Sequence, residues 1–186
     1  MHKLKLKEVS KILSGVYLRP SPIGNIAYLQ VSDLQRPNPE KTAITAEFAP
    51  KHSRYLIRKG DLLFAGKGNT YLCKLFDADL HAVPSTTLYI IRPTSDCILP
   101  EYLQWYLLLP QVEAKIKSSQ VGSNLPLIHK STLEEIEIPV PDEKTQSRIV
   151  ELSKLQQKEL NILSAIAEKR AQITNQKLIN IIMNND

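Results

Sequence analysis

The residue types that most often perform catalysis are present in this chain, but their spacing forms no reactive motif. No His-Glu-x-x-His metal pair and no Gly-x-Ser-x-Gly nucleophile elbow occurs. The histidines are widely separated, at His2, His52, His81 and His129. Cys73 and Cys97 are 24 positions apart, which makes no Cys-x-x-Cys pair or disulfide framework, so we predict two reduced thiols.

Two short segments resemble reactive motifs without having the geometry that those motifs need. Gly66-Lys67-Gly68-Asn69-Thr70 contains Gly-Lys but lacks the upstream glycine and the spacing of a phosphate-binding P-loop. Asp142 and Glu143 are adjacent, so on a helix their carboxylates point apart, and helix capping accounts for them better than a metal site does. Because no glycine-rich S-adenosylmethionine loop and no Asn-Pro-Pro-Tyr-type motif is present, we predict no cofactor and no catalysis in this chain.

The elements that must position any functional side chain are mostly short strands. Alternating or β-branched apolar runs predict strands at residues 26–31, 43–48, 62–65, 71–76, 86–92 and 136–138. Residues 4–13 predict a strand that runs into a short helix, and the polar residues 33–42 predict an exposed loop. The 62–65 and 71–76 strands predict a hairpin whose loop contains Lys67 between two glycines. A helix begins at Pro100, and Pro110 interrupts it.

The segment from Asp142 to Asp186 contains no glycine and no proline. A helix from Asp142 to about Ile182 would be about 60 Å long, far longer than an average helix. We expect part of it to project and to pack antiparallel against another long helix through a mixed seam; the alternative is a helix that lies on its own domain. The apolar residues expected in the seam are Ile149, Leu152, Leu155, Ile162, Leu163, Ile166 and Ile173.

The net charge of +5 is unevenly distributed. Residues 1–60 hold 11 Lys/Arg against 4 Asp/Glu, a balance of +7, whereas the rest of the chain has a balance of −2. A basic surface of this kind favours polyanions through counterion release, although charge alone is more typical of a solvated face. No apolar run reaches the ~18 residues of a membrane span and no signal-peptide core is present, so we expect a soluble, cytoplasmic protein without membrane association.

Four motifs occur in an order that resembles the DNA specificity subunits of type I restriction-modification systems. They are Lys59-Gly60-Asp61-Leu62-Leu63-Phe64, the segment Ile98 to Leu107, the Gly122-Ser123-Asn124-Leu125-Pro126 turn, and Ile138-Pro139-Val140-Pro141 before the Gln146-Ser147-Arg148-Ile149 helix. Each motif is weak alone, but four in the family's order are a strong signal, and the resemblance covers essentially the whole chain.

The resemblance implies an α+β fold in which a mixed, β-rich target-recognition domain (1–141) precedes a long helix for dimerisation and spacing (142–186). It implies double-stranded DNA, a methyltransferase subunit and a restriction subunit as partners, with S-adenosylmethionine and ATP used by those partners. Family members usually hold two recognition domains and two helices, so this chain looks like a half-size subunit that forms a homodimer and reads a bipartite site. The alternative is a regulatory protein that pairs with another specificity subunit without reading DNA.

Loop residues with base-reading or phosphate-binding chemistry are the candidates for DNA contact. They are Arg19, Asn25, Arg36, Asn38, Lys41, Lys67, Asn69 and Asn124, together with Gly66 and Gly68, which would let the backbone approach the duplex. We favour the Lys67–Asn69 loop. A turn shared across the family is more plausibly structural than sequence-reading, so Ser123 and Asn124 are weaker candidates for DNA contact. We expect the aromatic cluster of Tyr102, Trp105 and Tyr106 to lie in the core or at a subunit interface, and not to stack on bases.

Overall fold

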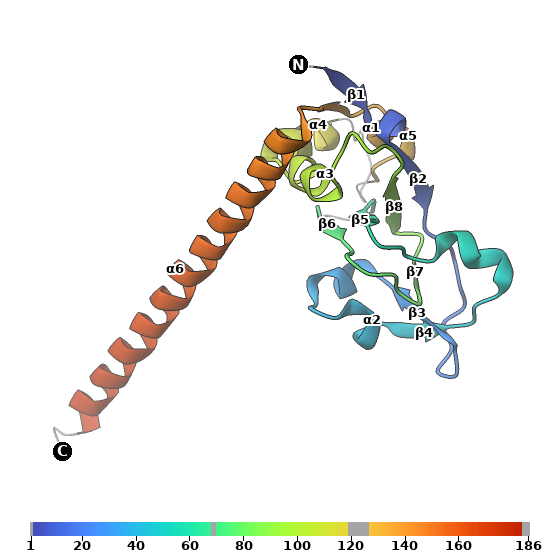
Figure 1. Cartoon of the computed structure of the whole chain (residues 1–186). Helices are drawn as coiled ribbons and strands as arrows, with labels where there is room; N and C mark the ends of the chain where they lie inside the picture. The colour runs from blue at the N-terminus through green and yellow to red at the C-terminus, as the bar shows by residue number, and fades with distance from the viewer. Residues whose placement is uncertain (1, 68–69, 119–126, 184–186) are drawn as a thin grey trace. The chain divides into compact units, whose positions relative to one another are not determined.

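The computed structural model of the chain describes residues 2–67, 70–118 and 127–183 (Figure 1). Contacts divide the chain into two units, Met1–Ser147 and Arg148–Asp186. The first unit contains all the strands and the short helices, and the second consists of most of one long helix.

A four-stranded antiparallel sheet forms the centre of the first unit. Its order is β2 (Ser10–Ser14), β8 (Leu88–Pro93), β5 (Leu62–Ala65) and β6 (Cys73–Leu75). All four residues of β5 are buried, as expected for an uninterrupted apolar run covered on both faces. The predicted hairpin is confirmed, because β5 pairs antiparallel with β6 in the register Leu62 to Leu75.

Two smaller sheets complete the unit. One has the order β4 (Ile44–Ala46), β3 (Ile26–Leu29) and β7 (Ala82–Pro84), in which β3 is antiparallel to β4 and parallel to β7. The other pairs β1 (Lys3–Lys5) with β9 (Glu137–Pro139), so the N-terminal strand lies beside the last strand of the unit. The sequence did not indicate β7, which is only three residues long.

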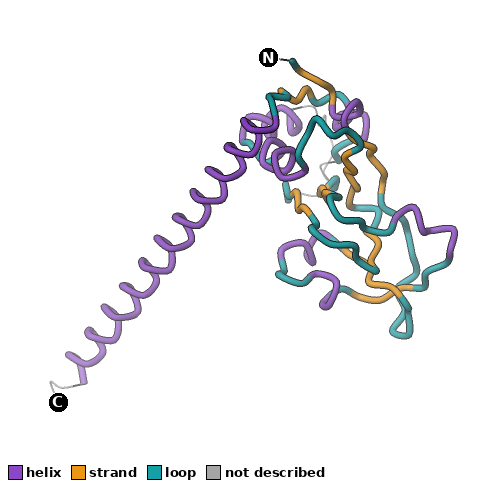
Figure 2. The backbone as a smooth tube through the Cα atoms, viewed as in Figure 1, coloured by secondary structure: helices purple, strands orange, loops and turns teal. Residues whose placement is uncertain are grey.

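The short helices follow or precede these strands along the chain and are drawn in purple in Figure 2. They are α1 (Leu6–Val9), the 3₁₀ helices η1 (Val31–Gln35) and η2 (Pro50–Tyr55), α2 (Pro39–Thr42), α3 (Pro100–Leu107), α4 (Pro110–Ser118) and α5 (Lys130–Glu134). Side-chain hydroxyls fasten α3 to β9, since Tyr102 donates to the Pro139 carbonyl at 2.8 Å and Tyr106 to the Glu137 carbonyl at 2.8 Å. The predicted core position is confirmed for Tyr102, which is buried.

The expectation of an exposed loop over residues 33–42 is wrong. This segment forms η1 and α2, and both Asp33 and Leu34 are buried. The Asp33 carboxylate accepts a hydrogen bond from the Gln30 backbone amide at 2.8 Å. Leu34 packs in a buried apolar cluster that includes Leu63 and Ile90. A single apolar side chain within polar residues gave no periodic signal, and its burial depends on packing that is distant in the sequence.

Two clusters of buried apolar side chains lie around the two larger sheets. One includes Leu63 and Ile90 of the four-stranded sheet together with Leu29 of the three-stranded sheet, so both sheets contribute to it. The other lies on the three-stranded sheet and includes Ile26 and Tyr28. Further side chains are buried outside these two clusters, among them Leu6, Phe64 and Leu103.

A buried ion pair lies close to both clusters. Asp61, which is 1% exposed, accepts hydrogen bonds from the Arg92 guanidinium at 2.7 and 2.6 Å and from the Arg58 amide at 2.8 Å. Arg92 also donates to the Leu56 carbonyl at 2.9 Å. The hydrogen bonds from Arg92 to Asp61 are the main reason that the pKa of Arg92 is raised. The pair ties the turn before β5 to strand β8.

The long helix α6 (Glu143–Met183) begins at a side-chain cap. The Asp142 carboxylate accepts from the Thr145 amide at 3.0 Å and from the Thr145 hydroxyl at 2.8 Å, so the predicted capping role is confirmed. These hydrogen bonds lower the pKa of Asp142. Gln146, which is 1% exposed, donates to the Cys97 and Pro141 carbonyls at 2.7 and 2.9 Å and accepts from the Leu99 amide at 2.9 Å. The first turn of the helix is thus part of the first unit.

In the second unit, large apolar side chains are exposed along the helix. The exposed seam candidates are Leu152, Leu155, Ile162, Leu163, Ile166 and Ile173, and Leu178, Ile179, Ile181 and Ile182 continue the series, whereas Ile149 is half-buried. Among the described helices, none is long and apolar enough to cross a membrane.

We predict that Asp61→Ala lowers the free energy of unfolding by about 3 kcal/mol, because it leaves the Arg92 guanidinium without its partner. Denaturant unfolding would measure this change. The matched control is Glu113→Ala, which removes the exposed ion pair with Lys117 and should cost less than about 1 kcal/mol. Equal losses in the two variants would contradict a structural role for the buried pair.

Candidate nucleic-acid interface

The Lys67 loop leaves the four-stranded sheet at the end of β5. Lys67 is exposed, and its backbone pairs with Leu127 in an isolated antiparallel bridge. Gly66 is buried, donates to the Thr87 carbonyl at 2.9 Å and accepts from the Ile128 amide at 2.9 Å. The base of this loop is therefore held on both sides, and Lys67 extends from a fixed position.

Packing accounts for the glycine at position 66. A Cβ atom there would lie 2.2 Å from Cε2 of the Tyr89 ring, and Tyr89 itself donates to the Ile128 carbonyl at 2.9 Å. The expected close approach of DNA to the Gly66 backbone stays a prediction. Gly68, Asn69 and Asn124, with the Gly122–Pro126 turn, lie outside the described residues.

Five other candidates lie on the segments before and after the strands of the three-stranded sheet, and the side chains of two of them support local backbone. The Asn25 side-chain oxygen accepts from the Phe48 amide at 2.9 Å. The Arg36 guanidinium donates to the Asp33 carboxylate at 3.4 Å and to the Thr42 carbonyl at 3.2 Å. Any contact of Asn25 or Arg36 with DNA would therefore have to compete with these bonds.

Arg19 and Lys41 are the more available cations of this group. Both are exposed, as is Asn38, and within residues 2–67, 70–118 and 127–183 the two cationic side chains form no hydrogen bond or ion pair. The Arg19 carbonyl accepts from the Glu47 amide at 3.4 Å, so its backbone runs beside the end of β4. Lys41 lies in α2, immediately before β4. The structure thus brings both cations to the segments that flank one strand.

The basic excess of residues 1–60 is partly neutralised within the fold. Lys5 and Lys7 both contact Glu135 at 2.5 Å, and Lys3 lies 3.7 Å from Glu137. Hydrogen bonds from Lys5 and then Lys7 lower the pKa of Glu135 to about 2. The N-terminal lysines are therefore partly compensated by two glutamates, whereas Arg19 and Lys41 have no ion-pair partner among the described residues.

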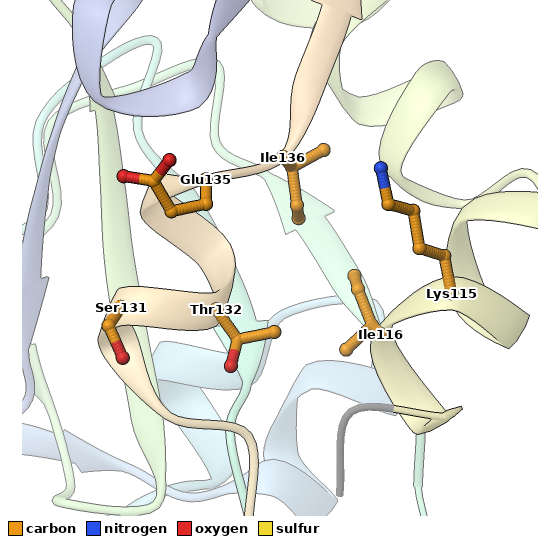
Figure 3. A pocket seen from close by; sticks show the side chains of 6 residues that line it. All are labelled: Lys115, Ile116, Ser131, Thr132, Glu135 and Ile136. Atoms are coloured by element: carbon orange, nitrogen blue, oxygen red, sulfur yellow. The ribbon is translucent and has the colours of Figure 1, made fainter.

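Two of the hollows on the described surface of the first unit lie beside residues of interest. One, of about 380 Å³, lies between α4 and α5, where Ile116 and Ile136 form an apolar wall and Lys115 extends along one side (Figure 3). The other, of about 410 Å³, lies between residues 20–22 and residues 43–45. In the described part of the chain, no three His, Cys, Asp or Glu side chains are grouped as a metal site would require. Exposed cations and other exposed side chains are the groups that this surface offers to a ligand.

Sequence reasoning missed two exposed residues that lie on either side of residues 20–22 in the chain. Tyr17 is 73% exposed and Ile23 is 91% exposed. A signal for Ile23 was present, because Pro22 and Gly24 on either side of it are turn residues that place an apolar side chain at a corner.

Comparisons with known proteins agree on one family. The family profile described as the type I restriction modification DNA specificity domain matches residues 1–183. The type I restriction enzyme HindI specificity subunit of Haemophilus influenzae is 30% identical over 111 residues, which cover 55% of this chain and 23% of that protein.

Solved structures show the same fold. A chain from a structure of the complex assembly and conformational transition of the type I R-M system has a TM-score of 0.71 and 24% identity, over 94% of this chain and 43% of that chain. The HsdS subunit from Thermoanaerobacter tengcongensis has a TM-score of 0.64 and 22% identity, over 88% of this chain and 38% of that chain. The chain therefore spans less than half the length of these relatives.

Proposed function

Because the chain belongs to the family of type I restriction-modification DNA specificity domains, we propose that it reads the target sequence for such a system. It binds double-stranded DNA and directs a separate methyltransferase subunit, and a restriction subunit, to that sequence. Methylation and cleavage are reactions of those partner chains, in the cytoplasm where the DNA lies. The observation that carries this proposal is the family match over residues 1–183, which includes both structural units.

The first unit is the proposed DNA reader. Arg19, Lys41 and Lys67 are exposed cations on held backbone, suited to phosphate oxygens or to guanine edges. Arg19 and Lys41 lie on segments that flank β4 of the three-stranded sheet, and Lys67 lies on the loop after β5. Contacts from these separate segments would let one small unit touch several base pairs of a half-site.

The second unit is the proposed spacer and dimerisation arm. At ~1.5 Å per residue, the 41 residues of α6 extend about 60 Å, and they expose a broad apolar stripe. Burial of that stripe against the antiparallel helix of a second copy would form a closed two-fold dimer. Such a dimer reads a bipartite, palindromic site, in which the helix length fixes the separation between the half-sites.

The primary test is a map of modified bases in the genome of a host with and without this gene. We expect loss of the gene to remove a two-part methylated motif, because the methyltransferase no longer reaches its target. A symmetric motif would support the homodimer. Persistence of every methylated motif would contradict the proposal and favour a regulatory protein that pairs with another specificity subunit.

We predict that the double change Lys67→Ala and Asn69→Ala weakens or relaxes the choice of target, because the loop loses a cation and an amide suited to base edges. The loss of one good bidentate contact corresponds to about tenfold or more in discrimination. The same methylation map measures it. Thermal unfolding should be unchanged, and an unaltered motif in this variant would remove the loop from the interface.

We predict that Ile166→Asp together with Ile173→Asp gives a folded monomer, because charges replace the apolar stripe. Light scattering measures the mass. The matched control is Asn161→Asp with Gln172→Asp, which adds the same charge about a third of a turn from the stripe and should leave the dimer intact. An unchanged dimer mass in the isoleucine variant would reject helix pairing.

A further inference from the structure

The turn Ser21–Gly24 is fixed on both sides to strand β4. The Gly24 amide donates to the Ser21 carbonyl at 2.9 Å, the Ser21 amide donates to the Thr45 carbonyl at 3.0 Å, and the Thr45 hydroxyl donates to the Ser21 carbonyl at 2.5 Å. On the other side, the Asn25 amide donates to the Ala46 carbonyl at 3.1 Å. In Figure 1 the turn is the blue loop beside β4. It is a short loop whose backbone has little freedom.

Close packing reinforces this rigidity. A Cβ atom at Gly24 would lie 2.5 Å from the backbone of Ala46, so the chain lies directly against β4. The preceding residues are also held, because the buried Tyr28 hydroxyl donates to the Val16 carbonyl at 3.0 Å. Hydrogen bonds and close packing therefore hold the backbone of the segment Val16–Gly24 in place, and we refer to this segment as the edge.

This edge presents side chains that have no role in the core. Tyr17 and Arg19 are exposed on either side of the buried Leu18, as in an extended segment with alternating faces. Ile23, at the tip, is 91% exposed. Among the described residues, the Arg19 side chain has no hydrogen-bond or ion-pair partner.

We propose that this edge is a base-reading element of the target-recognition unit, in which Ile23 contacts the 5-methyl group of a thymine in the major groove while Arg19 contacts a phosphate. The inference rests on the proposed function and assigns the Ser21–Gly24 turn to it. Apolar side chains recognise thymine through that methyl group, which no other DNA base carries. A rigid turn suits this contact, because little conformational entropy is lost on binding.

Membership of a DNA specificity family favours DNA over a protein partner as the occupant. Arg19 directly precedes residues 20–22, which line the hollow opposite residues 43–45, and its exposed guanidinium has no internal partner among the described residues. An exposed apolar tip and an unpaired cation on one rigid segment can meet a base edge and a neighbouring phosphate.

The test uses the full chain with its methyltransferase subunit and a library of random duplexes. After the wild-type motif has been selected, each thymine in it is replaced by deoxyuridine, which removes only the methyl group. We expect one replacement to weaken wild-type binding about fourfold, the value of burying one methyl group. Ile23→Ala should bind the thymine duplex about fourfold more weakly and should not respond to that replacement.

The matched control is Leu108→Ala, which truncates another exposed apolar residue, at the end of α3, and should keep the full response to deoxyuridine. If wild type and Ile23→Ala respond equally at every thymine, the inference is wrong although the DNA-reading function stands. The inference is also overturned if Ile23→Ala loses the methyltransferase subunit while keeping its DNA response, which would place a protein on this edge. If the wild-type chain selects no sequence, the proposed function itself fails.

Discussion

The arrangement of the two larger sheets depends on one polar interaction inside an apolar unit, the ion pair between Asp61 and Arg92. Its charges are tolerated in the interior because the two groups satisfy each other, and the Arg58 amide and Leu56 carbonyl take the remaining hydrogen bonds. Leu56 packs against the cluster on the three-stranded sheet, whereas Arg92 belongs to strand β8 of the four-stranded sheet. One pair of side chains therefore helps to set the position of one sheet against the other, and with it the positions of the exposed cations.

Three of the four motifs that carry the family resemblance contain residues that hold the framework together. Asp61 of the Lys-Gly-Asp segment forms the buried pair, Tyr102 fastens α3 to β9, and Gln146 holds the first turn of α6 through three hydrogen bonds. This distribution is physically reasonable, because a specificity family needs one framework that holds many different reading surfaces. Motifs can therefore identify such a protein while saying little about which residues touch DNA.

Sequence periodicity predicted the elements whose signal is local. The all-apolar strand at Leu62–Ala65, its hairpin partner and the glycine-free helix after Asp142 each follow from the residues within one segment. Strand β7 and the buried Leu34 depend on partners far away in the chain, so no window of sequence could show them. The site was harder to predict than the fold, since whether a lysine or an asparagine is available depends on tertiary neighbours.

Availability is what separates the candidates for DNA contact. Lys5 and Lys7 are as basic as Lys41 in the sequence, yet Glu135 occupies both of them, while Lys41 remains unpaired among the described residues. Asn25 has the chemistry to read adenine, but its side-chain oxygen already holds the Phe48 amide. A protein that must recognise a polyanion has to leave some cations without internal partners, at a small cost in stability. In this chain the unpaired cations are therefore the basis on which we propose a reading surface, in preference to the total count of lysine and arginine.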